Sequence, residues 1–185
     1  MVEISGKLVT IRDKRLDDAP DDYVWRKDEE LAALDANRPI SFPYQDFLRI
    51  YRDELAFPFS WSRRFGIDNL MGKHIGNCMY YDIDLSRNQT ELGIMIGDRG
   101  YWSQGYGTEA VRLLVGYIFA TMSIEKVYLH TLEWNVRARK SFQKAGFSEV
   151  KPVQRDGHDM ILMDVLKADW KDNNATESDG VVNNE

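Results

Sequence analysis

The feature that most constrains the fold is a glycine-containing turn between a strand-like run and an apolar helix-like run. The strand-like run covers residues 91–97, the turn contains Gly105 and Gly107, and the helix-like run covers residues 108–122. Apolar residues lie nearly all round that last run, so it should be a buried helix. The start of a helix leaves backbone N–H groups unpaired and carries partial positive charge, which favours a bound phosphate.

The two glycines have a second possible interpretation, as part of a turn that binds no ligand. Glycine lets the backbone adopt positive φ and come close to a ligand, but a plain strand-to-helix turn also uses glycine. A dinucleotide-binding fold is disfavoured, because it places three glycines after a parallel strand near the start of a βαβ repeat. Here the third glycine is absent and the turn follows strands joined by short turns.

The rest of the pattern predicts an α+β chain with a mostly antiparallel sheet. Apolar residues share one face at Ile75, Met79, Tyr81 and Ile83, and again on the run that contains Leu92, Ile94 and Ile96. The turns between these runs are short, which indicates an antiparallel meander. We expect strands at 7–12, 59–67, 73–83, 91–97, 125–132, 147–150 and 158–167, and helices after Pro20 and at 43–55, 108–122 and 135–146.

Composition limits the partners and the compartment. The 185 residues fit one domain, expected at 1–170, followed by a polar tail at 171–185 that we expect to be disordered. The formal net charge is -6, so nucleic acid is an unfavoured partner. No signal-peptide core and no apolar run of membrane-spanning length occurs, and there is a single cysteine, Cys78. We expect a cytoplasmic protein that does not enter membranes.

Several motifs in order resemble the GNAT superfamily of N-acetyltransferases. The turn matches the last two glycine positions of the family signature Q/R-x-x-G-x-G/A, with Trp102 where Gln or Arg is usual. An aromatic at that place resembles the Rim-type branch, which includes ribosomal-protein N-acetyltransferases. The resemblance covers about residues 7–170, and the matching downstream positions are Asn135, Ala138, Lys144, Gly146, Phe147, Gly157, Asp159 and Trp170.

The resemblance implies a GNAT fold, with a splayed pair of parallel strands and flanking helices, and acetyl-CoA as co-substrate. In this family the pantetheine arm lies between the splayed strands, here 91–97 and 126–132, and the pyrophosphate lies on the amides of the turn. The implied acetyl-CoA-binding residues are Ile94, Met95, Ile96, Trp102, Ser103, Gln104, Gly105, Tyr106, Gly107, Thr108, Asn135, Phe142 and Lys144.

Acyl transfer to an amine calls for a base and an acid. The amine must be neutral to attack, and Glu91, at the start of its strand and opposite the apolar face, is the candidate base. A solvated strand-end carboxylate is the alternative. Many relatives place a tyrosine where Phe142 stands, and phenylalanine cannot donate a proton, so Ser141 or Tyr128 are candidates for the acid, with water as an alternative.

Other chemistry-bearing residues have simpler interpretations. His130 reads as a structural histidine, and neither His74 nor His158 has a partner visible in sequence. The histidines and Cys78 lack metal-ligand spacing, so no metal is predicted. A helix face formed by Arg137, Lys140 and Lys144 is either a site for the 3′-phosphate of CoA or a solvated surface. The aromatics Trp25, Tyr44 and Trp61 lie in the region that this family uses for substrate, and isolated aromatics are more often core.

The function that these patterns favour is direct transfer of acetyl from acetyl-CoA to a primary amine within a ternary complex. The acceptor is a small-molecule amine or a protein N-terminus, and a homodimer is compatible with the family. The alternative is a sensor module that binds an acyl-CoA without turnover, because the family's tyrosine is absent at Phe142.

Overall fold

The computed structural model describes residues 2–170. Eight strands form one sheet in the order β1-β2-β3-β4-β5-β6-β8-β7, and β5–β6 is the parallel pair. The strands are β1 (Glu3–Ser5), β2 (Val9–Asp13), β3 (Arg63–Asn69), β4 (His74–Asp84), β5 (Gln89–Ile96), β6 (Lys126–Leu132), β7 (Ser148–Arg155) and β8 (His158–Leu166). The helical segments are η1 (Leu16–Asp18), α1 (Ala19–Lys27), α2 (Glu29–Leu34), α3 (Tyr44–Ala56), η2 (Arg99–Tyr101), α4 (Tyr106–Thr121) and α5 (Val136–Lys144).

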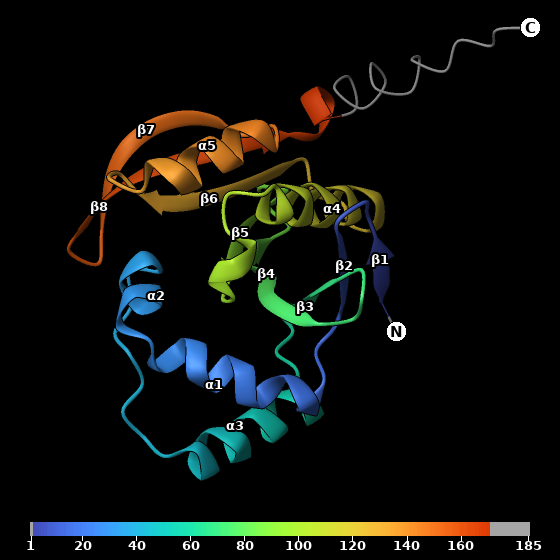
Figure 1. Cartoon of the computed structure of the whole chain (residues 1–185). Helices are drawn as coiled ribbons and strands as arrows, with labels where there is room; N and C mark the ends of the chain where they lie inside the picture. Colours follow the sequence, from blue (N-terminus) through green and yellow to red (C-terminus); the bar gives the residue numbers. More distant parts are fainter. Residues whose placement is uncertain (1, 171–185) are drawn as a thin grey trace, which may run out of the picture.

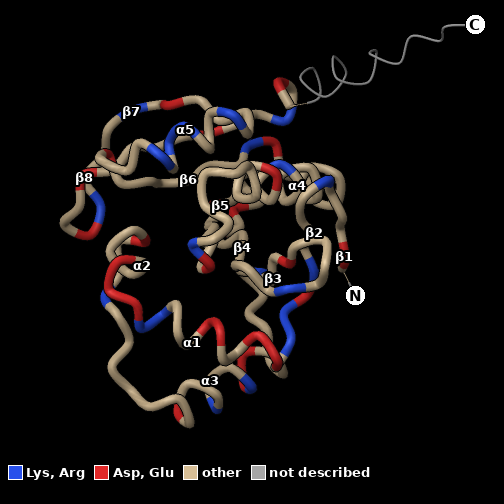
Figure 2. Tube along the Cα trace, in the orientation of Figure 1, with Lys and Arg blue, Asp and Glu red and all other residues tan. Residues whose placement is uncertain are grey.

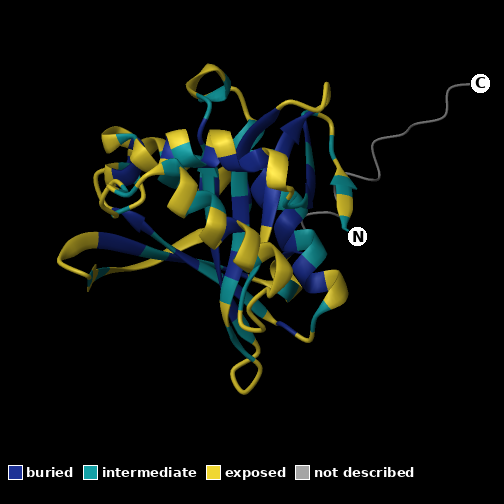
Figure 3. Cartoon of the chain, turned by 90° about the horizontal axis from the view of Figure 1, so that it is seen from below, coloured by how far each residue is buried: buried dark blue, intermediate teal, exposed yellow. Residues whose placement is uncertain are grey.

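The helices divide into two groups. The first three helices, α1–α3, lie together on one side of the sheet, whereas α4 and α5 lie on the other (Figure 1). The main core forms under α4, whose buried residues pack on strand residues such as Phe65 and Leu129. Buried segments run through the centre of the molecule, with exposed helix faces outside them (Figure 3). The prediction of a buried helix after the glycine turn is confirmed.

The first part of the chain departs from the sequence expectation. The strand expected at 7–12 forms at Val9–Asp13, and an unexpected strand, β1, pairs with it. The segment expected as one helix after Pro20 is divided at Asp28, whose backbone is extended with φ -72° and ψ 124°. The Asp28 carboxylate accepts a hydrogen bond from the Leu31 N–H, so this residue caps α2 and separates it from α1.

Of the four apolar residues expected on one face of β4, Ile75 belongs to the core and Ile83 packs against it, but Met79 and Tyr81 do not. Cys78 and Tyr80 are buried against the core under α4. Met79 and Tyr81 point to the opposite side of the strand, where they line the cavity described below. Both faces of this strand are apolar, so alternation alone could not assign the core face.

The end of α5 follows the prediction that Gly146 lies just past the helix. Gly146 has φ +104°, its N–H donates to Gln143 O, and the Phe147 N–H donates to Phe142 O. These two bonds form a Schellman motif, which favours a hydrophobic contact between its outer residues. The rings of Phe142 and Phe147 lie 6.2 Å apart, and Phe142 belongs to the core.

A buried ionic cluster ties η1 and α1 to the sheet. Arg12 of β2 binds both carboxylate oxygens of Asp18 at 2.6 Å and contacts Asp68 at 2.7 and 2.9 Å. Lys14 lies 2.7 Å from Asp22 of α1, which also accepts from the Tyr51 hydroxyl of α3. Acidic and basic residues alternate along this part of the trace (Figure 2). Removing one partner would leave buried charge unpaired, which is costly.

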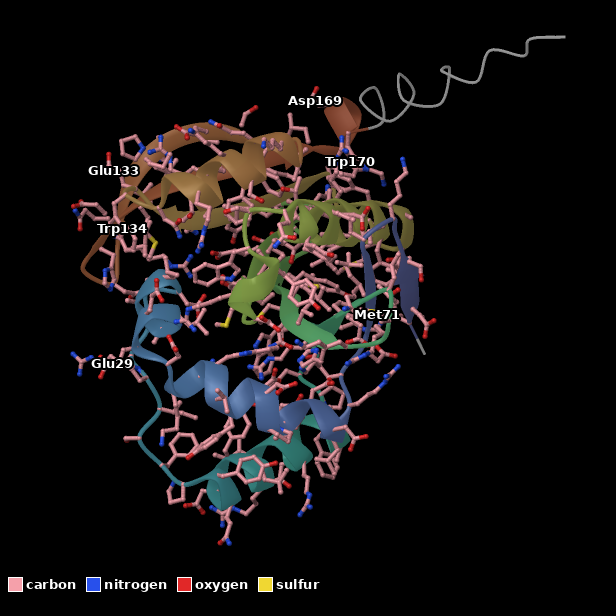
Figure 4. All side chains as sticks on the ribbon, in the orientation of Figure 1. Glu29, Met71, Glu133, Trp134, Asp169 and Trp170 are labelled. Carbon is pink, nitrogen blue, oxygen red and sulfur yellow. The ribbon has the colours of Figure 1, made fainter. Side chains whose placement is uncertain are left out.

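The boundary predicted for the domain, residue 170, coincides with the last of the described residues. Trp170 packs on Phe119 of α4 with ring centroids 6.3 Å apart (Figure 4). The tail predicted at 171–185 lies outside the described residues, so its disorder stays a prediction. Within residues 2–170, every helix falls short of the length and apolarity that crossing a bilayer requires.

Candidate functional site

The parallel strands β5 and β6 stay paired over a short stretch and then separate. Their ladder joins Gln89 to Lys126, Thr90 to Val127 and Glu91 to Tyr128, and no further pair follows along the described strands. The rest of both strands continues to Ile96 and Leu132 and lines a shared cavity. Because their ladder has ended, the edge of β5 that faces β6 can offer its backbone N–H and C=O groups to a ligand.

The cavity has a volume of about 1640 Å³ and two distinct ends. We call one end the turn half; it is lined by residues 94–96 of β5, by the turn that precedes α4 and by α5. The other end, the aromatic half, lies between α1–α3 and strands β3–β5. Its walls include Phe42, Phe47, Tyr51, Phe59, Met79 and Tyr81.

The turn half is built by backbone geometry. Gly105 is the residue before α4 and has φ +93°, in the left-handed region that favours glycine. No side chain caps the first turn of α4, so its leading N–H groups remain available at the positive end of the helix dipole. Ser103 also has positive φ, at 60°. This arrangement fits an anionic phosphate group.

Three charged or polar side chains meet between the two halves. The Glu91 Oε1 atom lies 2.8 Å from His130 Nδ1 and 2.6 Å from Arg155 Nη1, and Arg155 Nη1 lies 2.6 Å from His130 Nδ1. They come from β5, β6 and the end of β7, which the sheet order brings together around β8. All three line the cavity, and only 3% of the Glu91 side chain is exposed.

The environment of Glu91 favours its ionised form. Burial alone would raise the pKa of Glu91, but hydrogen bonds from His130, Arg155 and Tyr81 outweigh it and lower the pKa below its ordinary value. Burial and the nearby Glu91 charge raise the pKa of Tyr81. A carboxylate with a lowered pKa is a weak base by itself. The reading of Glu91 as a solvated strand-end carboxylate is therefore wrong, because the side chain is buried and paired.

The imidazole of His130 gives this group a route for protons. A guanidinium can only donate hydrogen bonds, so a neutral ring carries its proton on Nε2 when Arg155 is the partner of Nδ1. The ring carries its proton on Nδ1 when Glu91 is the partner. Within residues 2–170, the side-chain hydrogen bonds of His130 run through Nδ1, so Nε2 can serve a ligand as acceptor or donor.

The candidate acids occupy different positions. The Ser141 hydroxyl hydrogen-bonds to the Thr108 hydroxyl at 2.8 Å, and both residues line the turn half. Tyr128 pairs in register with Glu91, but it is not among the residues that line the cavity. Phe142 lines the cavity although most of its ring belongs to the core. The structure thus brings Ser141 to the cavity and does not bring Tyr128 there.

The predicted acetyl-CoA-binding residues largely gather at the turn half. Residues 94–96, Trp102, Ser103, Gly105, Gly107, Thr108, Asn135, Phe142 and Lys144 all line it, whereas Gln104 and Tyr106 do not. The Trp102 indole N–H donates to Ile96 O at 2.6 Å, which joins the turn to β5. Asn135 caps α5, because its side chain accepts from the Ala138 N–H.

Basic residues also border this end of the cavity. The Arg137 guanidinium lies 3.7 Å above the Trp102 ring, and Lys140 and Lys144 line the same end. The face that they form therefore borders the cavity. Its role in binding a phosphate stays a prediction.

Cysteine and metal chemistry have little support within residues 2–170. Cys78 is 2% exposed, and burial raises the pKa of its thiol well above the ordinary value. A thiolate is the nucleophilic form, so Cys78 is a core residue. No group of His, Cys, Asp and Glu side chains in this range is arranged to hold a metal ion. His74 is buried in the ionic cluster, and His158 pairs with Arg155 in the β7–β8 ladder.

Sequence reasoning missed Arg155 and Tyr81 and gave His130 a structural role. Arg155 lies 64 residues after Glu91, and nothing local to either residue marks the contact. A structural role was the preferred interpretation of His130, although the residue was expected on the strand beside the cleft. Its alternation on a strand beside the predicted cleft was the one available signal.

Comparisons with known proteins agree with this geometry. A model of the acetyltransferase (GNAT) domain family matches residues 9–148. An uncharacterized N-acetyltransferase, p20, of Bacillus licheniformis is 31% identical over 102 residues, covering 52% of this chain and 57% of that protein. The match thus spans little more than half of this curated relative.

Solved structures share the fold at low sequence identity. The crystal structure of spermidine N-acetyltransferase from Vibrio cholerae, in complex with CoA and spermine, has a TM-score of 0.79 and 17% identity, covering 90% of this chain and 99% of that one. Aminoglycoside acetyltransferase AAC(6')-Ib in complex with coenzyme A has a TM-score of 0.75 and 20% identity, with coverage of 90% and 99%. The predicted fold, a mostly antiparallel sheet with one parallel pair and flanking helices, is confirmed.

The family model confirms the predicted GNAT family but does not identify the branch within it. GNAT enzymes use acetyl-CoA as co-substrate. The structural relatives named above are spermidine and aminoglycoside acetyltransferases, so the Rim-type branch stays a prediction. Because the family model covers most of the described residues, this chain belongs to the GNAT acetyltransferase family.

Proposed function

We propose that this protein transfers the acetyl group of acetyl-CoA to a primary amine. The observation that carries the proposal is the early end of the β5–β6 ladder. It opens a cavity in which the glycine turn and the buried Glu91–His130–Arg155 group share one space. The first feature suits a phosphate-bearing acyl donor, and the second suits proton transfer.

The turn half offers backbone hydrogen-bonding groups and positive charge that suit acetyl-CoA. The pantetheine arm carries amides that can pair with the free edge of β5 at Ile94 and with the Ile96 N–H, because the Ile96 carbonyl already accepts the Trp102 indole N–H; Met95 lies between them. The pyrophosphate suits the uncapped first turn of α4 after Gly105. Arg137 stacked on Trp102, with Lys140 nearby, gives a basic border for a further phosphate.

Direct transfer within a ternary complex is favoured by two observations. Single ligands occupy sites of about 300–1,000 Å³, and this cavity, at about 1640 Å³, has room for a donor and an acceptor together. A covalent acyl-enzyme would call for an activated nucleophile. The single cysteine is buried, with a raised thiol pKa, and does not supply one.

The proposed reaction needs two proton transfers: one from the attacking amine nitrogen and one to the departing thiolate. The neutral amine nitrogen attacks the thioester carbonyl carbon, the carbon–sulfur bond breaks, and the amine nitrogen loses a proton. We assign that proton to His130 Nε2, with ionised Glu91 stabilising the imidazolium through Nδ1. Glu91 thus acts through His130, which amends its assignment as the direct base. A β5 N–H stabilises the developing oxyanion, and the departing thiolate takes a proton from water or from the Ser141 hydroxyl, which water then reprotonates.

The finer assignments rest on the sequence motifs. The turn around Trp102, the Asn135 helix and the segment 155–170 that ends at Trp170 support the Rim-type branch and, with it, a protein N-terminus as one acceptor class. Small-molecule amines are the other class, in keeping with relatives named for spermidine and aminoglycosides. The buried proton-handling group favours turnover over the sensor alternative, which has no use for it.

Calorimetric titration with acetyl-CoA tests the donor site. Gly105→Asp adds a negative charge within the phosphate cradle, and like charges about 4 Å apart near a surface repel by about 4 kcal/mol. We expect saturable binding by the wild type and affinity weakened about a hundredfold or more in the variant. Gly72→Asp is the matched control, because Gly72 also has positive φ, at 79°, but lies in an open turn away from the cavity.

The outcomes separate binding from turnover. Loss of binding in both variants would point to backbone strain and not to a phosphate cradle. No binding by the folded wild-type protein would overturn the proposal. Binding without amine-dependent thiol release, across a broad amine panel, would favour the sensor.

A further inference from the structure

We propose that the acceptor is a monoamine on an apolar, ring-sized body, and that the aromatic half rejects polycations. This inference rests on the proposed function, because it names the substrate class of the same cavity. Two independent observations support it: the apolar wall of the aromatic half, and the ion pairs that hold five of the six carboxylates bordering this half or the proton-handling group.

The wall and the floor of the aromatic half are apolar. Phe47 lies at the centre of the wall, 6.5 Å from the Phe42 ring and 5.6 Å from the Tyr51 ring. On the floor, Met79 and Tyr81 flank Gly93 of β5, where a Cβ would come within 3.3 Å of Met79 Cγ and 3.5 Å of Tyr81 Cε1. Removing apolar area from water stabilises a complex in proportion to that area, so this surface favours an apolar body.

The mouth of this half carries a flat aromatic pair. Phe59 lines the cavity and stacks on Trp61 with centroids 4.5 Å apart. Both rings stay partly exposed, at 45% and 56%. A ring or an alkyl chain that enters here meets aromatic faces before it reaches Glu91.

Five of the six carboxylates that border the aromatic half or the proton-handling group lie in ion pairs. The paired acids are Asp13, Asp22, Glu54, Glu91 and Asp156, and their partners are Arg63, Lys14, Arg64 and, for the last two, Arg155. The sixth, Asp35, accepts a hydrogen bond from the Asn37 amide, and burial raises the pKa of its carboxyl group. A polycation binds where several carboxylates are free to accept its ammonium groups. Apart from Asp35, this half offers a carboxylate only after an ion pair is broken.

One of the buried acids, Asp22, has all of its hydrogen-bonding positions occupied. Asp22 is held by Lys14 at 2.7 Å, by Asn77 Nδ2 at 2.7 Å and by the Tyr51 hydroxyl at 3.0 Å, and His74 Nε2 lies 3.1 Å from it. Burial alone would raise the pKa of Asp22, but the hydrogen bond from His74 and the charge of Lys14 lower it. Its carboxylate therefore stays ionised and engaged, with no lone pair left for a second ammonium.

Steady-state assays with defined acceptors test the inference. Thiol release from acetyl-CoA is measured with 2-phenylethylamine, spermidine, kanamycin and a short peptide with a free N-terminus. We expect kcat/KM for 2-phenylethylamine to exceed the other values by about tenfold or more, because ring-sized apolar contacts are worth that much in a fitted pocket.

Two variants and a control locate the effect. Phe47→Leu should raise KM for 2-phenylethylamine severalfold and leave acetyl-CoA binding unchanged. Phe57→Ala is the matched control, because Phe57 is 79% exposed and does not line the cavity.

Arg64→Gln tests the ion pairing. It leaves Glu54 unpaired, so it should raise kcat/KM for spermidine severalfold. Half of the Arg64 side chain is exposed, so its replacement preserves the packing.

The outcomes distinguish this inference from the proposed function. A preference for spermidine, kanamycin or the peptide, with acetyl-CoA bound, would overturn the monoamine acceptor and leave the transferase standing. An unchanged spermidine efficiency in Arg64→Gln would overturn the role of ion pairing. Failure to bind acetyl-CoA would overturn the proposed function and this inference together.

Discussion

The two halves of the cavity are built from different materials. The turn half depends on backbone: the free edge of β5, the left-handed Gly105 and the uncapped start of α4. The aromatic half depends on side chains that converge from α1–α3 and from strands β3–β5. A backbone-built site tolerates sequence change and can persist among relatives of low identity, whereas a side-chain-built site changes with each substitution. The first suits a common donor and the second an individual acceptor.

The largest expected effect comes from breaking the ionic cluster that anchors the aromatic half. Arg12→Met leaves Asp18 and Asp68 buried without their partner, so we expect the free energy of unfolding to fall by about 3–5 kcal/mol. Urea denaturation followed by circular dichroism measures it. Arg139→Met, which breaks the exposed pair with Glu149, is the control and should change stability little.

The same variant sharpens the comparison. If the cluster anchors only the aromatic half, the folded Arg12→Met protein keeps its acetyl-CoA affinity while KM for the acceptor rises. If acetyl-CoA affinity falls by the same factor as KM for the acceptor rises, the two halves are not independent.

The next effect concerns the group between the halves. Glu91→Gln keeps the side chain's size but removes the charge that stabilises an imidazolium at His130, so kcat should fall about a hundredfold. KM for acetyl-CoA should stay the same, because the turn half is backbone-built. Rapid thiol-release assays measure both constants, and Glu149→Gln on the exposed surface is the control. A rise in KM for acetyl-CoA with unchanged kcat would contradict the assignment.

The pH dependence of stability gives a separate check on Glu91. Its pKa in the folded protein is lowered from the ordinary value of 4.5, so its ionised form stabilises the fold. That contribution is fully present above pH 4.5 and is lost as the pH falls through the folded-state pKa. We expect the stability difference between wild type and Glu91→Gln to be constant from pH 6 to 8 and to shrink below pH 4.5. A difference that grows on acidification would show a raised pKa instead.

The smallest effect is expected at the basic border of the turn half. Arg137→Gln removes the guanidinium that lies 3.7 Å over the Trp102 ring at this border. An exposed charge pair contributes about 0.2–1 kcal/mol, so acetyl-CoA affinity should fall by up to about fivefold, as measured by calorimetry. Arg87→Gln, whose side chain pairs with Asp84 in the β4–β5 turn, should leave the affinity unchanged. No change in Arg137→Gln would identify this face as a solvated surface.

Local signals predicted some elements well and failed for others. The buried α4 and the glycine that ends α5 follow from residues close together in sequence, because apolar periodicity and positive φ are local properties. The division of the first helix at Asp28 was missed, since a capping aspartate looks like part of an acidic first turn. The predicted apolar face of β4 was only partly right, because the pairing of β4 with β3 and β5 is irregular near both of its ends and both of its faces are apolar, so that Ile75 and Ile83 lie with the core but Met79 and Tyr81 do not.

The sequence by itself determined the fold family and the local geometry of the turn half, which we propose as the donor site. The glycine turn between β5 and α4, and the helix that begins at Asn135, carry their geometry in the backbone over short stretches. Tertiary structure alone decided the partners of Glu91, because His130 and Arg155 reach it from strands that the sheet order brings together. It also decided which acids of the aromatic half are neutralised. Side-chain pairing across a sheet depends on register and packing, and these are set by the whole chain at once.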